Sequence, residues 1–185
     1  SSRCRMRTGG LSGFSDMPGG WLGDVGIGRG GHDAGHSGKT TREMVLNLAR
    51  LLNAGITCFL DLREPGENCS YEDDLSSEAA HLGIEIIYHR RSISDGDIPN
   101  PTQMMAILNQ VDDWLADDRL VYVHCQGGAG RTGTVVGCYL VRHGLESEEA
   151  LAKLRELRLE LPGGGGQSPE TQGQIEMVQT WRQGG

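Results

Sequence analysis

Apolar residues recur along most of the chain at spacings typical of helices. Residues 40–43 have capping-box spacing, and apolar positions then repeat every three to four residues as far as Gly55, which suits a helix end. Pro101 fits a first helical position, and Ser147 and Ser168 are expected N-caps. The pattern predicts helices over about 40–54, 72–82, 101–117, 131–143 and 147–160, and a last helix from 168 onward.

Short apolar runs between these helices predict buried strands. They cover residues 56–60, 84–88 and 120–123, and one more short strand is expected around 21–27. Helices that alternate with apolar strands are typical of layered α/β proteins. We therefore expect an α/β fold with a mostly parallel central sheet of about four to five strands, flanked by helices.

The glycine content divides the chain unevenly. Of the 185 residues 29 are glycine, and they gather before residue 39 and in the run Gly163–Gly166. We expect a partly irregular N-terminal segment over 1–38 and a single domain over 39–185, because a chain of this length suits one core. Too little chain follows Gly166 to form another domain, so the glycine run is expected to be a loop.

Charge and cysteine content limit the classes of partner. The formal net charge of −8 argues against nucleic acid or an anionic membrane as a partner. Five cysteines without a CxxC spacing favour a reduced, cytoplasmic protein, and no apolar run is long enough to span a bilayer. His32, Asp33 and His36 lie in a glycine-rich stretch that is poorly suited to hold a metal, so we expect neither metal nor cofactor. The oligomeric state stays open.

The most informative segment runs from His124 to Thr132. A strand enters it and a helix leaves it, so free N–H groups and the positive end of the helix dipole meet there. Three glycines between Gln126 and Arg131 allow the backbone to curl into an anion-binding nest. Cys125 at the base of such a nest is expected to be a thiolate nucleophile, since the amides and Arg131 favour its ionised form.

The other residues of this segment are expected to bind phosphate or to support the loop. Arg131 can bind two phosphate oxygens at once through its planar fork. Thr132 can donate its hydroxyl to the thiolate, and His124 is expected to support the loop through its ring nitrogen. The predicted phosphate-binding residues are Gln126, Gly127, Gly128, Ala129, Gly130 and Arg131.

The segment HCQGGAGRT resembles the HCx5R(S/T) signature of the protein tyrosine and dual-specificity phosphatase superfamily. The resemblance covers roughly residues 40–182, and the glycine pair in the loop is most similar to cyclin-dependent kinase-associated phosphatases and small microbial tyrosine phosphatases. It implies the cysteine-phosphatase fold and a metal-free, two-step reaction through a phosphocysteine intermediate. The expected partner is a phosphorylated protein or peptide, with phosphotyrosine as the first expectation and dual specificity left open.

A leaving-group oxygen needs a general acid. Residues 92–99 resemble the family's general-acid loop, which makes Asp95 the expected acid, with Asp97 as the competitor. Gln174 fits the family's water-positioning glutamine somewhat better than Gln172. The alternatives to a protein phosphatase are a phosphoprotein-binding pseudophosphatase and a phosphatase of phosphoinositides or sugar phosphates. Because the loop carries no lysine, a phosphoinositide is the weaker expectation.

Overall fold

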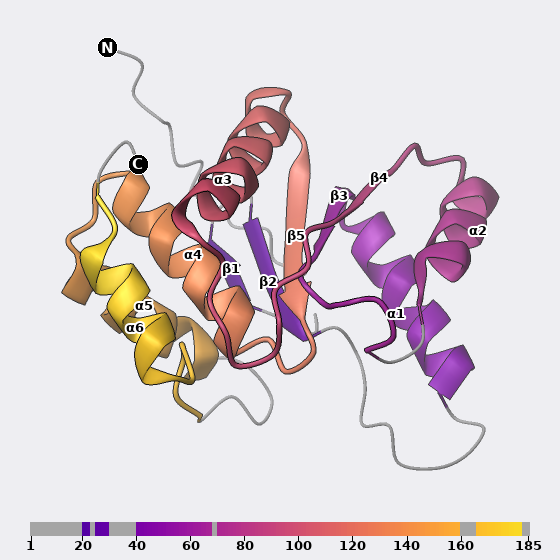
Figure 1. The fold of residues 1–185 in the computed structure, drawn as a ribbon. Helices are drawn as coiled ribbons and strands as arrows, with labels where there is room; N and C mark the ends of the chain where they lie inside the picture. The colour runs from indigo at the N-terminus through magenta and orange to yellow at the C-terminus, as the bar shows by residue number, and fades with distance from the viewer. Residues whose placement is uncertain (1–19, 23–24, 30–39, 68–69, 160–165, 183–185) are drawn as a thin grey trace.

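A computed structural model describes residues 20–22, 25–29, 40–67, 70–159 and 166–182, with side chains from residue 46 onward (Figure 1). Its centre is one five-stranded sheet in the order β1-β2-β5-β3-β4. The strands are β1 (Gly20–Leu22), β2 (Val25–Arg29), β3 (Ile56–Asp61), β4 (Ile87–Arg90) and β5 (Leu120–Cys125). Only the pair β1–β2 is antiparallel, so the expected mostly parallel sheet is confirmed.

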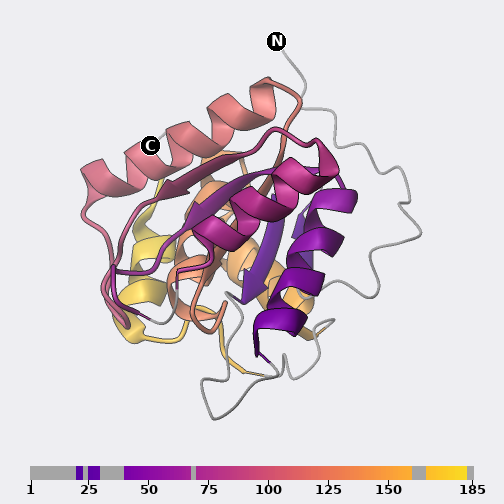
Figure 2. The same cartoon turned by 90° about the vertical axis from the view of Figure 1, so that its right-hand side faces the viewer.

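Six described helices cover the two faces of the sheet. They are α1 (Thr40–Asn53), α2 (Glu72–Leu82), α3 (Pro101–Ala116), α4 (Gly130–Arg142), α5 (Ser147–Leu159) and α6 (Gln172–Thr180). Helices α1 and α2 lie on one side, and α3 to α6 lie on the other (Figures 1 and 2). The expected α/β fold with flanking helices is therefore confirmed.

Side chains of the central strands alternate between two hydrophobic cores, one on each face of the sheet. In β5, Val121 and Val123 join the larger core with α3, α4, α5 and α6, whereas Tyr122 joins the smaller core with α1 and α2. All three side chains are at most 5% exposed. This double burial explains why the strand shows a nearly continuous apolar run, and it fixes β5 in the middle of the sheet.

Some expected boundaries were wrong. The strand expected at 84–88 begins only at Ile87, because the Ile84 N–H is taken by the Ala79 carbonyl at the end of α2. The helix expected from Ser168 begins at Gln172, where Thr171 and Gln174 form the capping box. Helix α5 begins at Ser147 itself, and its Ala150 N–H bonds to the Glu146 carbonyl, so the cap lies one residue earlier than expected.

The region before residue 39 is described only in part. Instead of one short strand around 21–27, the described residues form β1 and β2, and β2 lies beside β5. His32, Asp33, His36 and the stretch 163–165 lie outside the described residues, and the division into 1–38 and 39–185 stays a prediction. No helix within the described ranges is long and apolar enough to cross a membrane.

Candidate active site

Cys125 is the last residue of the central strand β5. It is 2% exposed and stands opposite Arg29 of β2, while the neighbouring His124 stands opposite Asp61 of β3. The loop after it spans four residues before α4 begins at Gly130. In parallel α/β sheets, ligands bind outside the carboxyl ends of the strands, and Cys125 lies at such an end. The predicted strand–loop–helix arrangement is present.

Two loop carbonyls are held by side chains from elsewhere in the chain. Arg158 of α5 donates from Nη1 to the Gly128 carbonyl at 3.1 Å, and Ser168 donates from Oγ to the Ala129 carbonyl at 2.8 Å. In a trans peptide, the carbonyl and the following N–H point in opposite directions. The N–H groups of Ala129 and Gly130 therefore point away from these partners, as an anion-binding nest requires.

The loop needs glycine at two positions. Gly128 has a φ of +67°, a conformation that side chains rarely tolerate. At Gly130, a Cβ would lie only 2.6 Å from Oε2 of Glu170 and about 3 Å from the amide of Gln174. The glycines between Cys125 and Arg131 thus permit both the backbone turn and the close packing of residues 170–174 against it.

Arg131 is 1% exposed and bound to two carboxylates. Its Nη1 and Nη2 donate to the two carboxylate oxygens of Glu67 at 2.7 and 2.8 Å, and Nη1 also donates to the Ile93 carbonyl at 3.0 Å. Asp95 lies 2.9 Å from Nη2. The hydrogen bond from Arg131 lowers the pKa of Glu67, and Glu67 in turn raises the pKa of Arg131 against the opposing effect of burial. The guanidinium is charged and rigidly held.

Two buried polar atoms in the first turn of α4 have no hydrogen-bond partner in the described part of the chain. They are Nε of Arg131 and Oγ1 of Thr132. The predicted bond from Thr132 to the Cys125 thiolate is not formed in this structure. Buried polar groups are nearly always paired, so these two donors suit a ligand with acceptor oxygens. A phosphate group has such oxygens.

His124 lies directly beneath the loop and is fully buried. Its Nδ1 is 3.4 Å from the Cys125 carbonyl, and its Nε2 is 2.5 Å from the hydroxyl of Tyr71. Burial lowers the pKa of His124 to about 4, although the nearby Asp61 acts in the opposite direction. The neutral ring can donate to the carbonyl through Nδ1 and accept from Tyr71 through Nε2. His124 thus contacts the loop backbone and Tyr71, and its supporting role stays a prediction.

A buried ion-pair network lies next to His124. Asp61 accepts from Arg63 at both oxygens, at 2.9 and 2.8 Å, and from the Tyr88 hydroxyl at 2.8 Å. Burial acts to raise the pKa of Asp61, but the hydrogen bonds from Arg63 outweigh it and hold that pKa well below its usual range. Burial and the bond to Asp61 raise the pKa of Tyr88 to about 12. This network holds the charged side chains of Asp61 and Arg63 in fixed positions next to His124.

The loop over residues 92–99, called the acid loop below, holds its two aspartates in different environments. The side chain of Asp95 is 78% exposed and reaches Arg131. The side chain of Asp97 accepts the N–H of the next residue, Ile98, at 2.8 Å. The loop is tied down by Gln174, whose Nε2 donates to the Asp97 carbonyl at 3.1 Å. Asp95 is therefore the aspartate whose carboxylate contacts Arg131, and its role as the general acid stays a prediction.

Gln174 is buried against the loop, but its amide is already engaged. Its Oε1 accepts the N–H groups of Glu170 and Thr171, in addition to the bond that its Nε2 makes to the acid loop. Gln172 bonds to Glu176 on the surface of α6. Gln174 thus links the acid loop to the start of α6, and the idea that it positions water stays a prediction.

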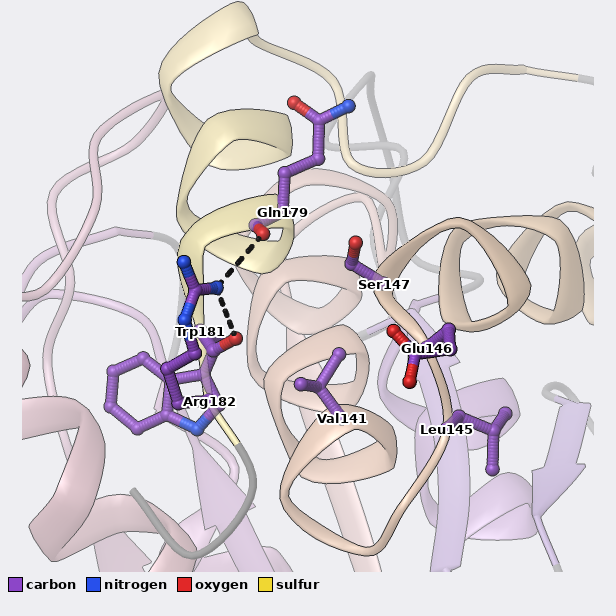
Figure 3. Close-up of a pocket in the computed structure, with 7 residues that line it drawn as sticks. All are labelled: Val141, Leu145, Glu146, Ser147, Gln179, Trp181 and Arg182. Carbon is purple, nitrogen blue, oxygen red and sulfur yellow. Dashed lines mark hydrogen bonds between the residues drawn. The ribbon is translucent and has the colours of Figure 1, made fainter.

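A hollow in the structure lies far from this chemistry. It is lined by residues at the end of α4, the start of α5 and the end of α6, including Val141, Ser147 and Trp181 (Figure 3). Helix α4 has 13 residues, so the hollow is about 20 Å from the Cys125 loop at its other end. None of the predicted site residues lines it. Within the described ranges, no cluster of His, Cys, Asp or Glu could hold a metal ion.

A thiol at the base of a nest, with a buried arginine six positions later, defines the class of cysteine-dependent phosphatases. The family model described as "Polymorphic toxin system, DSP-PTPase phosphatase" matches residues 34–145, and the chain belongs to this family. The chain is thus a member of the tyrosine and dual-specificity phosphatase superfamily, as its loop sequence predicted.

Solved structures of phosphatases share the fold. The structure of Tk-PTP in its active form is 25% identical, with a TM-score of 0.61 over 83% of this chain and 88% of that one. Kinase associated phosphatase (KAP) is 22% identical, with a TM-score of 0.62 over 83% of each chain.

Curated relatives match over shorter stretches. Arabidopsis thaliana PTEN1, a phosphatidylinositol 3,4,5-trisphosphate 3-phosphatase and protein-tyrosine-phosphatase, is 32% identical over 50% of this chain. Homo sapiens cyclin-dependent kinase inhibitor 3 is 33% identical over 40%. The chain covers only 23% and 35% of the lengths of these two relatives.

Proposed function

We propose that this protein hydrolyses phosphomonoesters, with phosphotyrosine in proteins or peptides as its substrate and Cys125 as its nucleophile. The observation that carries the proposal is the pair of unpartnered buried donors, Arg131 Nε and Thr132 Oγ1, in the first turn of α4 directly after the Cys125 loop. A tetrahedral dianion can accept from these donors and from the nest amides together. Membership of a phosphatase family supports the same reaction.

In the first step, the thiolate of Cys125 attacks phosphorus in line with the leaving oxygen. The S–P bond forms as the P–O bond to the substrate breaks, and Asp95 donates its proton to the departing oxygen. Arg131 and the nest amides hold the three non-bridging oxygens, where negative charge is concentrated. Glu67 keeps the Arg131 fork in one orientation through its two hydrogen bonds. The product is a phosphocysteine and the free hydroxyl of the substrate.

In the second step, water attacks phosphorus and the S–P bond breaks. Asp95, now a carboxylate, accepts a proton from the water, and the electron pair of the bond returns to Cys125 as a thiolate. As the S–P bond breaks, the Thr132 hydroxyl can turn from the phosphate to the developing thiolate, because no described protein group holds it. Inorganic phosphate leaves, and the enzyme returns to its starting state.

The family description also suggests a biological setting. It supports a role as the phosphatase part of a polymorphic toxin system. Phosphoinositide hydrolysis is the competing activity, because one curated relative carries that activity in its name. The absence of lysine from residues 126–130 favours the phosphoprotein substrate, since the extra phosphates of such lipids need extra cations.

Hydrolysis of para-nitrophenyl phosphate without added metal tests the reaction. We expect turnover that vanadate inhibits and that Cys125→Ser abolishes, because serine at this position is a far weaker nucleophile. Cys138→Ser is the matched control, since Cys138 is equally buried but lies inside α4. Activity that survives in Cys125→Ser, or that requires a divalent metal, would refute the mechanism.

A further inference from the structure

Carboxylates from three segments gather around the mouth of the proposed active site. Glu67 and Asp95 both contact Arg131, and Glu64 is linked to the acid loop because it accepts a hydrogen bond from Ser94 at 3.0 Å. Glu170 lies against the Cys125 loop at Gly130, and Asp97 is exposed beside Asp95. We call this group the acidic rim: Glu64, Glu67, Asp95, Asp97 and Glu170.

Among the side chains that the structure describes, cations around the same mouth do not balance the acidic rim. Most of the guanidinium groups near the loop are buried or half-buried and bound to protein acceptors, namely those of Arg63, Arg90, Arg131 and Arg158. Arg91 is the exposed basic residue among residues 61–67, 90–98, 126–131 and 166–174. Glu67 and Asp95 pair with Arg131, so within these described ranges Glu64, Asp97 and Glu170 face one exposed guanidinium. The net charge of the chain is already −8.

This charge pattern acts in opposite ways on the phosphate and on the groups next to it. The nest amides and Arg131 attract a dianion at the centre, whereas the rim repels further anions and attracts cations a few ångströms away. One exposed pair of unit charges about 8 Å apart in water changes affinity by about twofold. Several such pairs acting together reach about tenfold, and salt weakens them because the Debye length is about 8 Å at physiological ionic strength.

We propose that the acidic rim makes this site selective for phosphorylated peptide segments flanked by lysine or arginine. The inference rests on the proposed function, since it concerns what lies next to the phosphate in the substrate. A polyphosphorylated lipid headgroup would bring its additional phosphates against the carboxylates of the rim. A basic peptide segment would instead bring its side chains within reach of Glu64 and Glu170, which are exposed.

Binding to the Cys125→Ser protein tests the selectivity without relying on turnover. Two fluorescent phosphotyrosine peptides of equal length carry either lysine or glutamate on both sides of the phosphotyrosine. We expect the lysine peptide to bind about tenfold more tightly at about 30 mM salt, and the difference to shrink at about 300 mM. Equal affinities, or tighter binding of vesicles containing a phosphoinositide than of the lysine peptide, would overturn the inference.

Matched variants locate the effect on the rim. Glu64→Gln and Glu170→Gln in the Cys125→Ser background should each lower the preference for the lysine peptide by about twofold. Glu156→Gln removes the same charge from an exposed position on α5 and should keep the preference. A preference that falls equally in Glu156→Gln would contradict a role for the rim. Turnover of para-nitrophenyl phosphate by the unmodified protein is measured separately, so a failed mechanism and a failed selectivity give different results.

Discussion

Replacing Arg158 by methionine removes the guanidinium that holds the Gly128 carbonyl, while methionine keeps most of the apolar side chain in the core. Arg158 is 6% exposed and donates to Gly128 at 3.1 Å and to Gly166 at 3.3 Å. A hydrogen bond that involves a charged group contributes about 1.5–3 kcal/mol. Loss of the bond to the Gly128 carbonyl frees the peptide between Gly128 and Ala129 to rotate. The Ala129 N–H, which belongs to the same peptide, then no longer points into the nest.

The expected cost falls on phosphate binding. The loss of about 1.5–3 kcal/mol corresponds to a 10- to 100-fold decrease in kcat/KM for para-nitrophenyl phosphate. Because vanadate occupies the same nest, its inhibition constant should rise by a similar factor. Steady-state kinetics with and without vanadate measure both quantities on the same protein.

Arg155→Met is the matched control for this experiment. Arg155 lies on the same helix, carries the same charge and is exposed. We expect it to change both quantities by less than about twofold, since exposed charges contribute little. If Arg158→Met lowers the melting temperature but leaves the vanadate inhibition constant unchanged, the residue acts on stability alone and the account of the loop is refuted.

Three further predictions concern the acid, the arginine clamp and the buried histidine. Asp95→Asn should slow phosphotyrosine hydrolysis by about 100-fold or more, whereas a larger loss in Asp97→Asn would reverse the assignment. Glu67→Gln should lower kcat/KM about tenfold, because a neutral amide holds Arg131 more weakly than a carboxylate; an unchanged value would show that Glu67 is dispensable. The folded-state pKa of His124, about 4, lies below the unfolded value of about 6.5, so its contribution to stability is present above pH 6.5 and is lost as the pH falls toward 4. That loss is about 3 kcal/mol. Urea unfolding at neutral and acidic pH should detect it in the unmodified protein but not in His124→Asn. An equal pH dependence of the unfolding free energy in both proteins would contradict the role of His124.

The sequence predicted most of the helices and strands because burial of one face gives each type a characteristic spacing of apolar residues. Helix α2 has the expected boundaries, 72–82, and α3 begins at the expected Pro101. The start of β4 was wrong by three residues, because Ile84 and Ile86 are apolar enough for a strand but pack against the α1–α2 core before the ladder with β3 begins at Ile87. Apolar composition alone does not distinguish these two uses of isoleucine.

The site was predictable where its residues are neighbours in sequence. Cys125, Arg131 and the glycines form one local motif, and its chemistry follows from the spacing. Glu67 and Arg158 were missed as partners of this motif. They lie 64 and 30 positions from the atoms they bind, and only the packing of α5 and of the β3–α2 loop brings them there.

Ser168 shows the same limit in another way. Its position before Pro169 is a standard helix start signal, yet its hydroxyl donates to the Ala129 carbonyl and the helix begins later, at Gln172. Serine suits either use, because its hydroxyl can bind any nearby backbone acceptor or donor. Packing decides between these two uses: Ser168 lies so close to Gly133 of α4 that a Cβ at position 133 would not fit.

Direct detection of phosphate on Cys125 tests the central claim most closely. The protein is mixed with para-nitrophenyl phosphate, quenched within milliseconds in alkaline detergent, and digested with trypsin to release the peptide from Leu120 to Arg131. Mass spectrometry should find a phosphate adduct on Cys125 in the unmodified protein and none in Cys125→Ser. Turnover without this adduct, or an adduct on another residue, would contradict a phosphocysteine mechanism at this site.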